Sequence, residues 1–396
     1  MTTDLAYTAP RRALPIDKLG VLVALLIAAG WVLLPFATFK ANRIVQGQGR
    51  IVFDALPGIE AAMLSLIIAI ALPVIFYRTP LRWRLGISAA GVLGLLLAIG
   101  QTAVFLTPAG NTLARVSPGA GFWLLLFAFL LLAADGLTRL KLAPWPRIGL
   151  LALAAVVLGL ILINGAWNGL SLLKEYSVRA DAFWREAGTH VILAFGSLVV
   201  ATVVGVPLGI LCYRVPRVRA VILNVLNAIQ TVPSIALFGL LIAPLGWVAA
   251  NVPGAAAIGI SGIGFTPALV ALFIYSLLPV VANTVVGLDG VPPDANDAAR
   301  GMGMTDRQRL WQIEMPLAFP VILTGIRIVL VQNIGLATVA ALIGGGGFGV
   351  FVFQGIGQTA LDLVLLGALP TVLLAFAAAI ILDAVVEMTQ ARVRRG

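Results

Sequence analysis

The chain has few of the residues that metal sites, disulfides and acid–base catalysis use. Its 396 residues include one cysteine, Cys212, and one histidine, His190. A single cysteine excludes an intrachain disulfide and any zinc or iron–sulfur cluster built from cysteines. One histidine without clustered carboxylates provides neither a metal site nor an acid–base constellation. The sequence therefore predicts no metal, no cofactor and no membrane-embedded enzyme.

Charged residues are also scarce, at 11% of the chain, whereas 61% of the residues are hydrophobic and the mean hydropathy is +1.06. Soluble domains have about half apolar and about a quarter charged residues. The composition therefore predicts a polytopic protein surrounded by membrane lipid. The net charge of +10 would suggest nucleic acid in a soluble chain. Here the basic residues lie in short loops between apolar runs, so no nucleic-acid partner is expected.

Apolar runs of span length recur along the sequence. A transmembrane helix needs about 20 predominantly apolar residues. Ten runs meet this requirement: 19–39, 59–77, 85–106, 119–137, 148–170, 191–213, 221–248, 266–288, 317–343 and 363–386. No cleavage site of small residues follows the first run, so it is expected to be a retained helix. The predicted fold class is all-α, with about ten transmembrane helices.

A polar segment divides these runs into two groups of five. The predicted domains are an N-terminal membrane unit of about five helices at 1–170, an external linker at 171–188 and a C-terminal core at 189–396. Ten alternating spans put 18 of the 26 Lys and Arg residues on one side and 7 on the other, with Arg327 inside a span. The richer side is cytoplasmic by the positive-inside rule. Both termini and the polar residues 292–316 are predicted to lie on that side.

Residues 292–316, which we call the elbow segment, are polar in an otherwise apolar half. Their pattern predicts two short helices. The first has Asp294 as N-cap and ends at Gly303, and the second starts at Thr305, whose spacing to Gln308 is that of a capping box. Pro316 lacks an amide hydrogen and disfavours helix at the residue before it, so we expect the segment to end there.

Fixed offsets within the elbow segment match a known motif. The matching residues are Asp297, Ala298, Ala299, Gly303, Ile313, Met315 and Pro316. They resemble the cytoplasmic "EAA" loop of ABC-importer permeases, in which Glu-Ala-Ala is followed by Gly six residues after the Glu, Ile sixteen after it, and a closing Leu-Pro. Asp replaces the preferred Glu here, and Met replaces the preferred Leu. The resemblance implies that this loop docks into a groove of an ATPase subunit, and that residues 189–396 form the five-helix core of a type I ABC importer.

Three features indicate a translocation path. Gln230-Thr231-Val232-Pro233-Ser234 interrupts an apolar run with a proline and hydrogen-bonding side chains, which is typical of a broken helix lining a cavity, although helix packing is an alternative. Arg327 lies about 16 Å along its span from Pro316. It is either a functional group or a structural one, which snorkels or pairs with Asp383, Glu387 or Glu314. The predicted path residues are Gln230, Thr231, Pro233, Ser234, Tyr275 and Arg327.

Residues 230–239, 274–279 and 299–304 are similar to the importer branch that handles glycine betaine, choline and related osmoprotectants. This resemblance implies a multi-pass permease subunit in the bacterial inner membrane. Its implied partners are ABC ATPase subunits, a periplasmic or tethered solute-binding protein, and a second permease copy, identical or paralogous. The chain has no Gly-x-x-x-x-Gly-Lys-Ser/Thr, so ATP hydrolysis is expected in a separate subunit.

Two alternative functions stay open. One is an importer permease for another small solute, such as an amino acid. The other is a stand-alone secondary transporter or channel, which would need coupling carboxylates or a charged ring at mid-membrane. The acidic residues that could serve as coupling carboxylates instead fall near the ends of the predicted spans: Asp135, Asp289, Asp362, Asp383 and Glu387.

Overall fold

The computed structural model describes residues 16–43 and 45–393, which form two compact units. The first comprises the described residues up to Leu142 together with Val157–Lys174, and the second comprises Ala143–Val156 and the described residues from Glu175 onward. Helices α6 (Pro144–Ile163) and α7 (Ser171–Val178) contribute residues to both units. Both chain ends, predicted to be cytoplasmic, lie outside the described residues.

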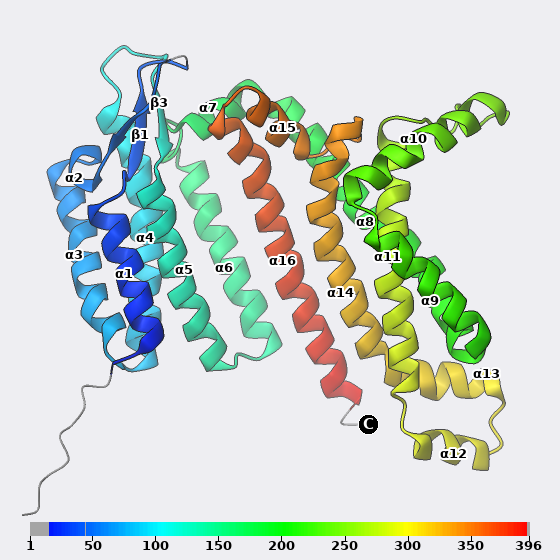
Figure 1. Cartoon of the computed structure of the whole chain (residues 1–396). Helices are drawn as coiled ribbons and strands as arrows, with labels where there is room; N and C mark the ends of the chain where they lie inside the picture. The colour runs from blue at the N-terminus through cyan, green and yellow to red at the C-terminus, as the bar shows by residue number, and fades with distance from the viewer. Residues whose placement is uncertain (1–15, 44, 394–396) are drawn as a thin grey trace, which may run out of the picture. The chain divides into compact units, whose positions relative to one another are not determined.

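Within the described part of the chain, nine helices are long and apolar enough to cross a membrane, and α1 is a shorter apolar helix. The predicted, mainly helical membrane fold is thereby confirmed. The helices of the first unit, besides α6, are α1 (Lys18–Val32), α2 (Val52–Ala55), α3 (Gly58–Phe76), α4 (Leu81–Leu106) and α5 (Ala120–Leu140), as Figure 1 shows. Their core is built from large apolar side chains such as Ile27, Ile68, Leu95 and Phe129, all buried.

The first unit also contains a small sheet that the sequence did not predict. Strand β1 (Ala37–Lys40) pairs antiparallel with β2 (Gln48–Arg50) and with β3 (Arg115–Pro118), in the order β2-β1-β3. The run 19–39 had been predicted as one span, but helix α1 ends at Val32 and the chain continues into β1. Strands of three or four residues are too short to show an alternating pattern in a sequence.

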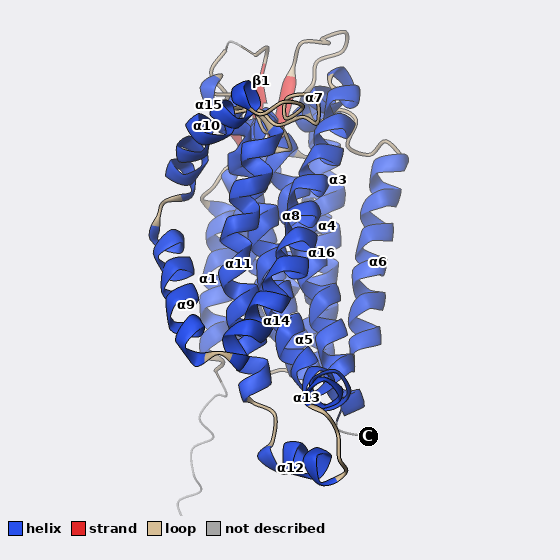
Figure 2. Cartoon of the chain, turned by 90° about the vertical axis from the view of Figure 1, so that its right-hand side faces the viewer, coloured by secondary structure: helices blue, strands red, loops and turns tan. Residues whose placement is uncertain are grey.

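The second unit is a helical bundle in which the elbow segment is followed by three further helices. Its elements are α8 (Ala180–Arg214), α9 (Pro216–Thr231), α10 (Ser234–Asn251), α11 (Phe265–Asp289), α12 (Pro293–Gly301), α13 (Asp306–Arg309), the π-helical turn η1 (Leu310–Glu314), α14 (Met315–Val339), the 3₁₀ turn η2 (Ala340–Ile343), α15 (Gly349–Gly357) and α16 (Leu361–Val393). Figure 2 shows α12 and α13 at one end of this bundle and α10 and α15 at the opposite end.

A buried polar triad lies where α8, α11 and α14 meet. The Asn333 amide donates to Ser197 Oγ and to Ser276 Oγ, both at 2.8 Å, and all three side chains are fully buried. Each serine also donates to a carbonyl of its own helix. Because every polar group of the triad has a partner, it fixes how the three helices pack at little cost in free energy.

Two predicted boundaries differ from the structure. Residues 171–188, predicted as a linker, are mostly helical, because α7 begins at Ser171 and α8 at Ala180. Their location outside the membrane stays a prediction. The run 221–248 is not one span but parts of two helices, with α9 ending at Thr231 and α10 beginning at Ser234. Pro233 separates them, since its ring fixes φ and removes an amide donor.

Candidate functional site

Helix α12 begins one residue earlier than its predicted cap. Its N-cap is Pro292, without a side-chain hydrogen bond, and Pro293 is the first helical residue. The prediction that Asp294 caps the helix is therefore wrong; Asp294 lies in the first turn. Proline suits the first position because that amide would have no partner inside the helix, and an acidic residue in the first turn favours the positive end of the helix dipole.

Gly303 ends α12 as predicted, in a Schellman motif. Its φ is +77°, in the left-handed region that glycine adopts without strain. The Gly303 amide donates to the Arg300 carbonyl at 2.9 Å, and the Met304 amide donates to the Ala299 carbonyl at 3.1 Å. This pair of bonds satisfies the last carbonyls of the helix and turns the chain sharply.

The predicted capping box at the start of α13 is confirmed. The Gln308 amide donates to Thr305 Oγ1 at 3.3 Å, and the Thr305 amide donates to Gln308 Oε1 at 2.9 Å. The predicted end of the segment at Pro316 is wrong, because α13, η1 and α14 follow one another without a break. The π-helical turn directly before Pro316 widens the helix at the point where the proline ring would otherwise meet the preceding turn.

A buried ion network ties this turn to the C-terminal end of α8. Glu314 Oε1 accepts from Arg309 Nε at 3.0 Å, and Glu314 Oε2 accepts from Arg214 Nη2 at 3.1 Å. The Glu314 side chain is 1% exposed and that of Arg309 is 8% exposed. Arg309 Nη2 also lies 3.0 Å from the exposed carboxylate of Asp306. Both oxygens of a fully buried carboxylate thus have a cationic partner, so the network is satisfied.

The outer surface of the elbow segment is apolar in part, and two of its large apolar side chains are not covered by the described residues. Met302 is 68% exposed and Trp311 is 56% exposed, although both are large hydrophobic residues. Asp297 and Arg300 form an exposed pair, with 3.7 Å between Oδ1 and Nη1. Of the motif residues predicted to couple to an ATPase, Ala299 is buried, Ile313 is half-buried, and the rest are exposed: Asp297, Ala298, Gly303 and Pro316.

The predicted break near Pro233 is held by two of the predicted path residues. Gln230 Nε2 donates to the Tyr275 carbonyl at 2.9 Å. The Tyr275 hydroxyl in turn donates to the Val232 carbonyl, which belongs to the residue between the two helices. Tyr275 is 5% exposed. The freed backbone group at the break is therefore satisfied by α11, as an irregular backbone at membrane depth requires.

The other predicted path residues lie in different surroundings. Thr231 Oγ1 donates to the Ala228 carbonyl of its own helix at 2.7 Å, and Pro233 is the N-cap of α10. Arg327 Nη1 lies 2.8 Å from Asp383 Oδ1 of α16, so the ion pair considered as its structural alternative is present. The structure thus brings Gln230 and Tyr275 together, whereas Arg327 forms an ion pair with α16 instead. That these residues line a path stays a prediction.

Sequence reasoning missed the buried ion network and the polar triad. Glu314 was considered only as a partner for Arg327, and Arg214 and Arg309 were counted only as loop charges. One signal in the sequence pointed to the ion network. Glu314 directly precedes Met-Pro at the edge of an apolar run, and a carboxylate that is buried there needs a cation. Nothing in the sequence identifies which cation, because Arg214 is 100 residues away.

Two family models match the chain. The one described as "ABC transporter permease YehY, N-terminal domain" matches residues 17–173. The one described as "Binding-protein-dependent transport system inner membrane component" matches residues 205–395, which include the elbow segment and the break at Pro233.

Curated proteins with similar sequences are import permeases. The osmoprotectant import permease protein OsmW of Salmonella typhimurium is 43% identical over 47% of this chain and 81% of its own length. The carnitine transport permease protein OpuCB of Listeria monocytogenes is 38% identical over 47% of this chain and 78% of its own. The glycine betaine/carnitine/choline transport system permease protein OpuCB of Bacillus subtilis is 34% identical over 52% of this chain and 87% of its own.

Proposed function

Because the chain belongs to the family of binding-protein-dependent transport system inner membrane components, we propose that it is the permease through which an osmoprotectant enters the cell. It is a non-catalytic, multi-pass subunit of an ABC importer. Glycine betaine, choline or a related quaternary ammonium compound is the proposed solute. The support is that relatives named for osmoprotectants, carnitine, and glycine betaine, carnitine and choline are 34–43% identical to this chain.

The elbow segment is the proposed docking site for an ATPase subunit. The observation that carries this is the exposed apolar surface of Met302 and Trp311 at one end of the bundle. Exposed large hydrophobic groups beside an ion pair are typical of a binding surface. The Schellman turn, the capping box and the buried network around Glu314 preorganise this surface, which lowers the entropy that docking would cost.

We assign the remaining parts of the importer by the same proposal. A second permease copy, identical or paralogous, would complete the pathway, and a periplasmic or tethered binding protein would deliver the solute. The elbow segment and both termini would face the cytoplasm of a bacterial inner membrane, as the distribution of basic residues predicts. Aromatic side chains that recognise a quaternary ammonium group would belong mainly to the binding protein.

Gly303→Val tests the docking site. Its φ of +77° is unfavourable for a residue with a Cβ, by about 1–2 kcal/mol and more for a β-branched one. No heavy atom of the described residues lies within 4 Å of the added Cβ, so the expected effect is on the backbone turn alone. We expect membrane insertion to persist, while co-purification of a co-expressed ATPase subunit and solute uptake are lost.

Gly301→Val is the matched control. Gly301 is the last residue of α12 and does not have a positive φ. In the part of the chain that the structure describes, a Cβ added there also meets no atom within 4 Å. It should retain assembly and uptake. Normal assembly and uptake by Gly303→Val would refute docking through this turn.

Uptake into proteoliposomes tests the solute and the energy source. The complete importer should accumulate labelled glycine betaine or choline when ATP is supplied, and unlabelled carnitine should compete. Accumulation of an amino acid instead would favour the other importer function. Uptake that persists without ATP, driven by an ion gradient, would instead identify a secondary transporter.

A further inference from the structure

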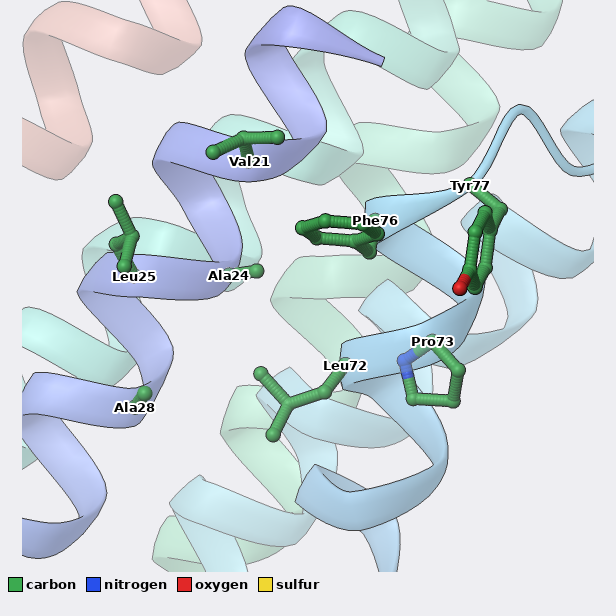
Figure 3. Close-up of a pocket in the computed structure, with 8 residues that line it drawn as sticks. All are labelled: Val21, Ala24, Leu25, Ala28, Leu72, Pro73, Phe76 and Tyr77. Carbon is green, nitrogen blue, oxygen red and sulfur yellow. The ribbon is translucent and has the colours of Figure 1, made fainter. Parts of the chain in front are cut away.

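A lateral groove runs between α1 and α3 in the first unit (Figure 3). Its volume is about 410 Å³, within the range of small-molecule sites. Val21, Leu25 and Ala28 line it from α1, and Leu72, Phe76 and Tyr77 line it from α3. The Phe76 ring projects from α3 toward α1. Its lining is almost entirely apolar, so it suits hydrocarbon rather than a polar solute.

The groove exists because α1 and α3 are in close contact at one end, and α1 has small residues in the turns after that contact. A Cβ added at Gly20 would collide with the Ile75 carbonyl, so the backbones are in close contact there. The Asp17 amide donates to the Phe76 carbonyl at 3.2 Å beside the same contact. One and two turns further along α1, Ala24 and Ala28 are too small to fill the space beside α3. The depression is therefore set by backbone packing and does not depend on one rotamer.

Basic side chains flank the end of the groove where α1 begins and α3 ends. Lys18 lies on the same helical stripe as Val21, Leu25 and Ala28, one turn beyond Val21. Arg78 directly follows Tyr77. Both are exposed, and so is Arg82. The nearby acids Asp17 and Asp135 both pair with Arg84, and Asp135 also pairs with Arg139. Among the described residues, this end of the groove therefore has an excess of positive charge.

We propose that this groove holds one acyl chain of an anionic glycerophospholipid, with the lipid phosphate between Lys18 and Arg78. A helix of a partner protein is about 10 Å across and could only lie over the groove. A neutral lipid would gain little, because hydrocarbon in the groove replaces hydrocarbon in the bilayer. The preference for this lipid over bulk lipid therefore comes from its headgroup, whose negative charge matches the basic end of the groove.

Native mass spectrometry of the full-length chain tests the proposal. The protein is stripped of lipid in detergent and titrated with phosphatidylglycerol or phosphatidylethanolamine that carry the same acyl chains. The wild type should retain one phosphatidylglycerol with an affinity on the order of tenfold above that for phosphatidylethanolamine. Equal retention of the two lipids by the wild type would overturn the proposal.

Two variants separate the headgroup from the groove. Lys18→Gln with Arg78→Gln should abolish the preference for phosphatidylglycerol, whereas Arg217→Gln with Lys141→Gln removes the same charge elsewhere and should preserve it. Ala28→Phe fills the groove and should prevent retention of the bound lipid, whereas Ala90→Phe adds the same ring to an exposed position of α4, away from the lining residues. If either test variant behaves like its control, the groove is not the site. The charge variant decides independently if Ala28→Phe fails to fold.

Discussion

Glu314→Ala should detach the elbow segment from α8. The wild-type carboxylate, 1% exposed, accepts from Arg309 at 3.0 Å and from Arg214 at 3.1 Å. Without it, the guanidinium of Arg309, 8% exposed, keeps only Asp306, whose side chain is 80% exposed. Removing one partner of a buried ion pair costs about 3–5 kcal/mol. We expect about 3 kcal/mol, because Asp306 and water still compensate part of the charge and Arg214 is partly solvated.

The single cysteine provides the assay. Cys212 is fully buried and lies two residues before Arg214, at the end of α8 that the network holds. A water-soluble maleimide reacts with it only when this end opens, so its rate reports the free energy of local opening. A loss of about 3 kcal/mol should accelerate labelling about a hundredfold. Solute uptake by the assembled importer should fall in the same variant.

Glu387→Ala is the matched control for Glu314→Ala. Its carboxylate also pairs with an arginine, with 2.6 Å between Glu387 Oε2 and Arg147 Nη2, but the two side chains are 45% and 30% exposed. An exposed pair contributes about 0–1 kcal/mol. Labelling of Cys212 should therefore change less than about fivefold. Labelling and uptake at the wild-type level in Glu314→Ala would refute the idea that the buried network holds the elbow segment.

Three further changes test other parts of the structure. Asn333→Leu should destabilise the purified chain by about 2 kcal/mol, because leucine offers no hydrogen bond to the two buried serines; thermal unfolding in detergent measures this. Tyr275→Phe leaves the Val232 carbonyl without its donor, at about 1–3 kcal/mol, and should reduce uptake while ATPase assembly stays intact; normal uptake would contradict it. Burial raises the pKa of Asp17, but the hydrogen bond and charge of Arg84 outweigh this and leave the pKa below its ordinary value. The resulting stabilisation is present above about pH 4 and is lost as the pH falls through the lowered pKa; the melting temperature of Asp17→Asn should lack this acid-dependent fall.

Features that depend on neighbouring residues could be predicted from the sequence. Apart from the runs 19–39 and 221–248, each predicted apolar run corresponds to one long helix, because span length is fixed by bilayer thickness. The capping box at Thr305 and the turn at Gly303 follow from side chains and backbone freedom within a few residues. The break before Pro233 follows from proline chemistry. In each case the deciding interaction lies within one or two turns of the chain.

Features that depend on distant partners could not be predicted. Glu314 and Arg214 are 100 residues apart, and Asn333 and Ser197 are 136 residues apart. Strand β3 pairs with β1 across three intervening helices of the first unit. The local rule also failed at Pro316, where a π-helical turn lets the helix continue. A proline restricts the backbone of the residue before it, but the helical residues around it determine whether the helix ends there or continues through a wider π-helical turn.

The elbow segment is continuous with α14 at its C-terminal end, and this determines how a push on it would travel. Beyond α13 the helix continues without a break to Val339, so a displacement of α13 reaches Asn333 along one helix. Asn333 is bonded to α8 and α11, so we infer that these three helices would move as one body. Helices α9 and α10 are separated from each other by the break before Pro233. They would be displaced relative to the body formed by α8, α11 and α14. The bond from Gln230 to the Tyr275 carbonyl joins the two parts, so Gln230→Ala should alter uptake while ATPase assembly is retained.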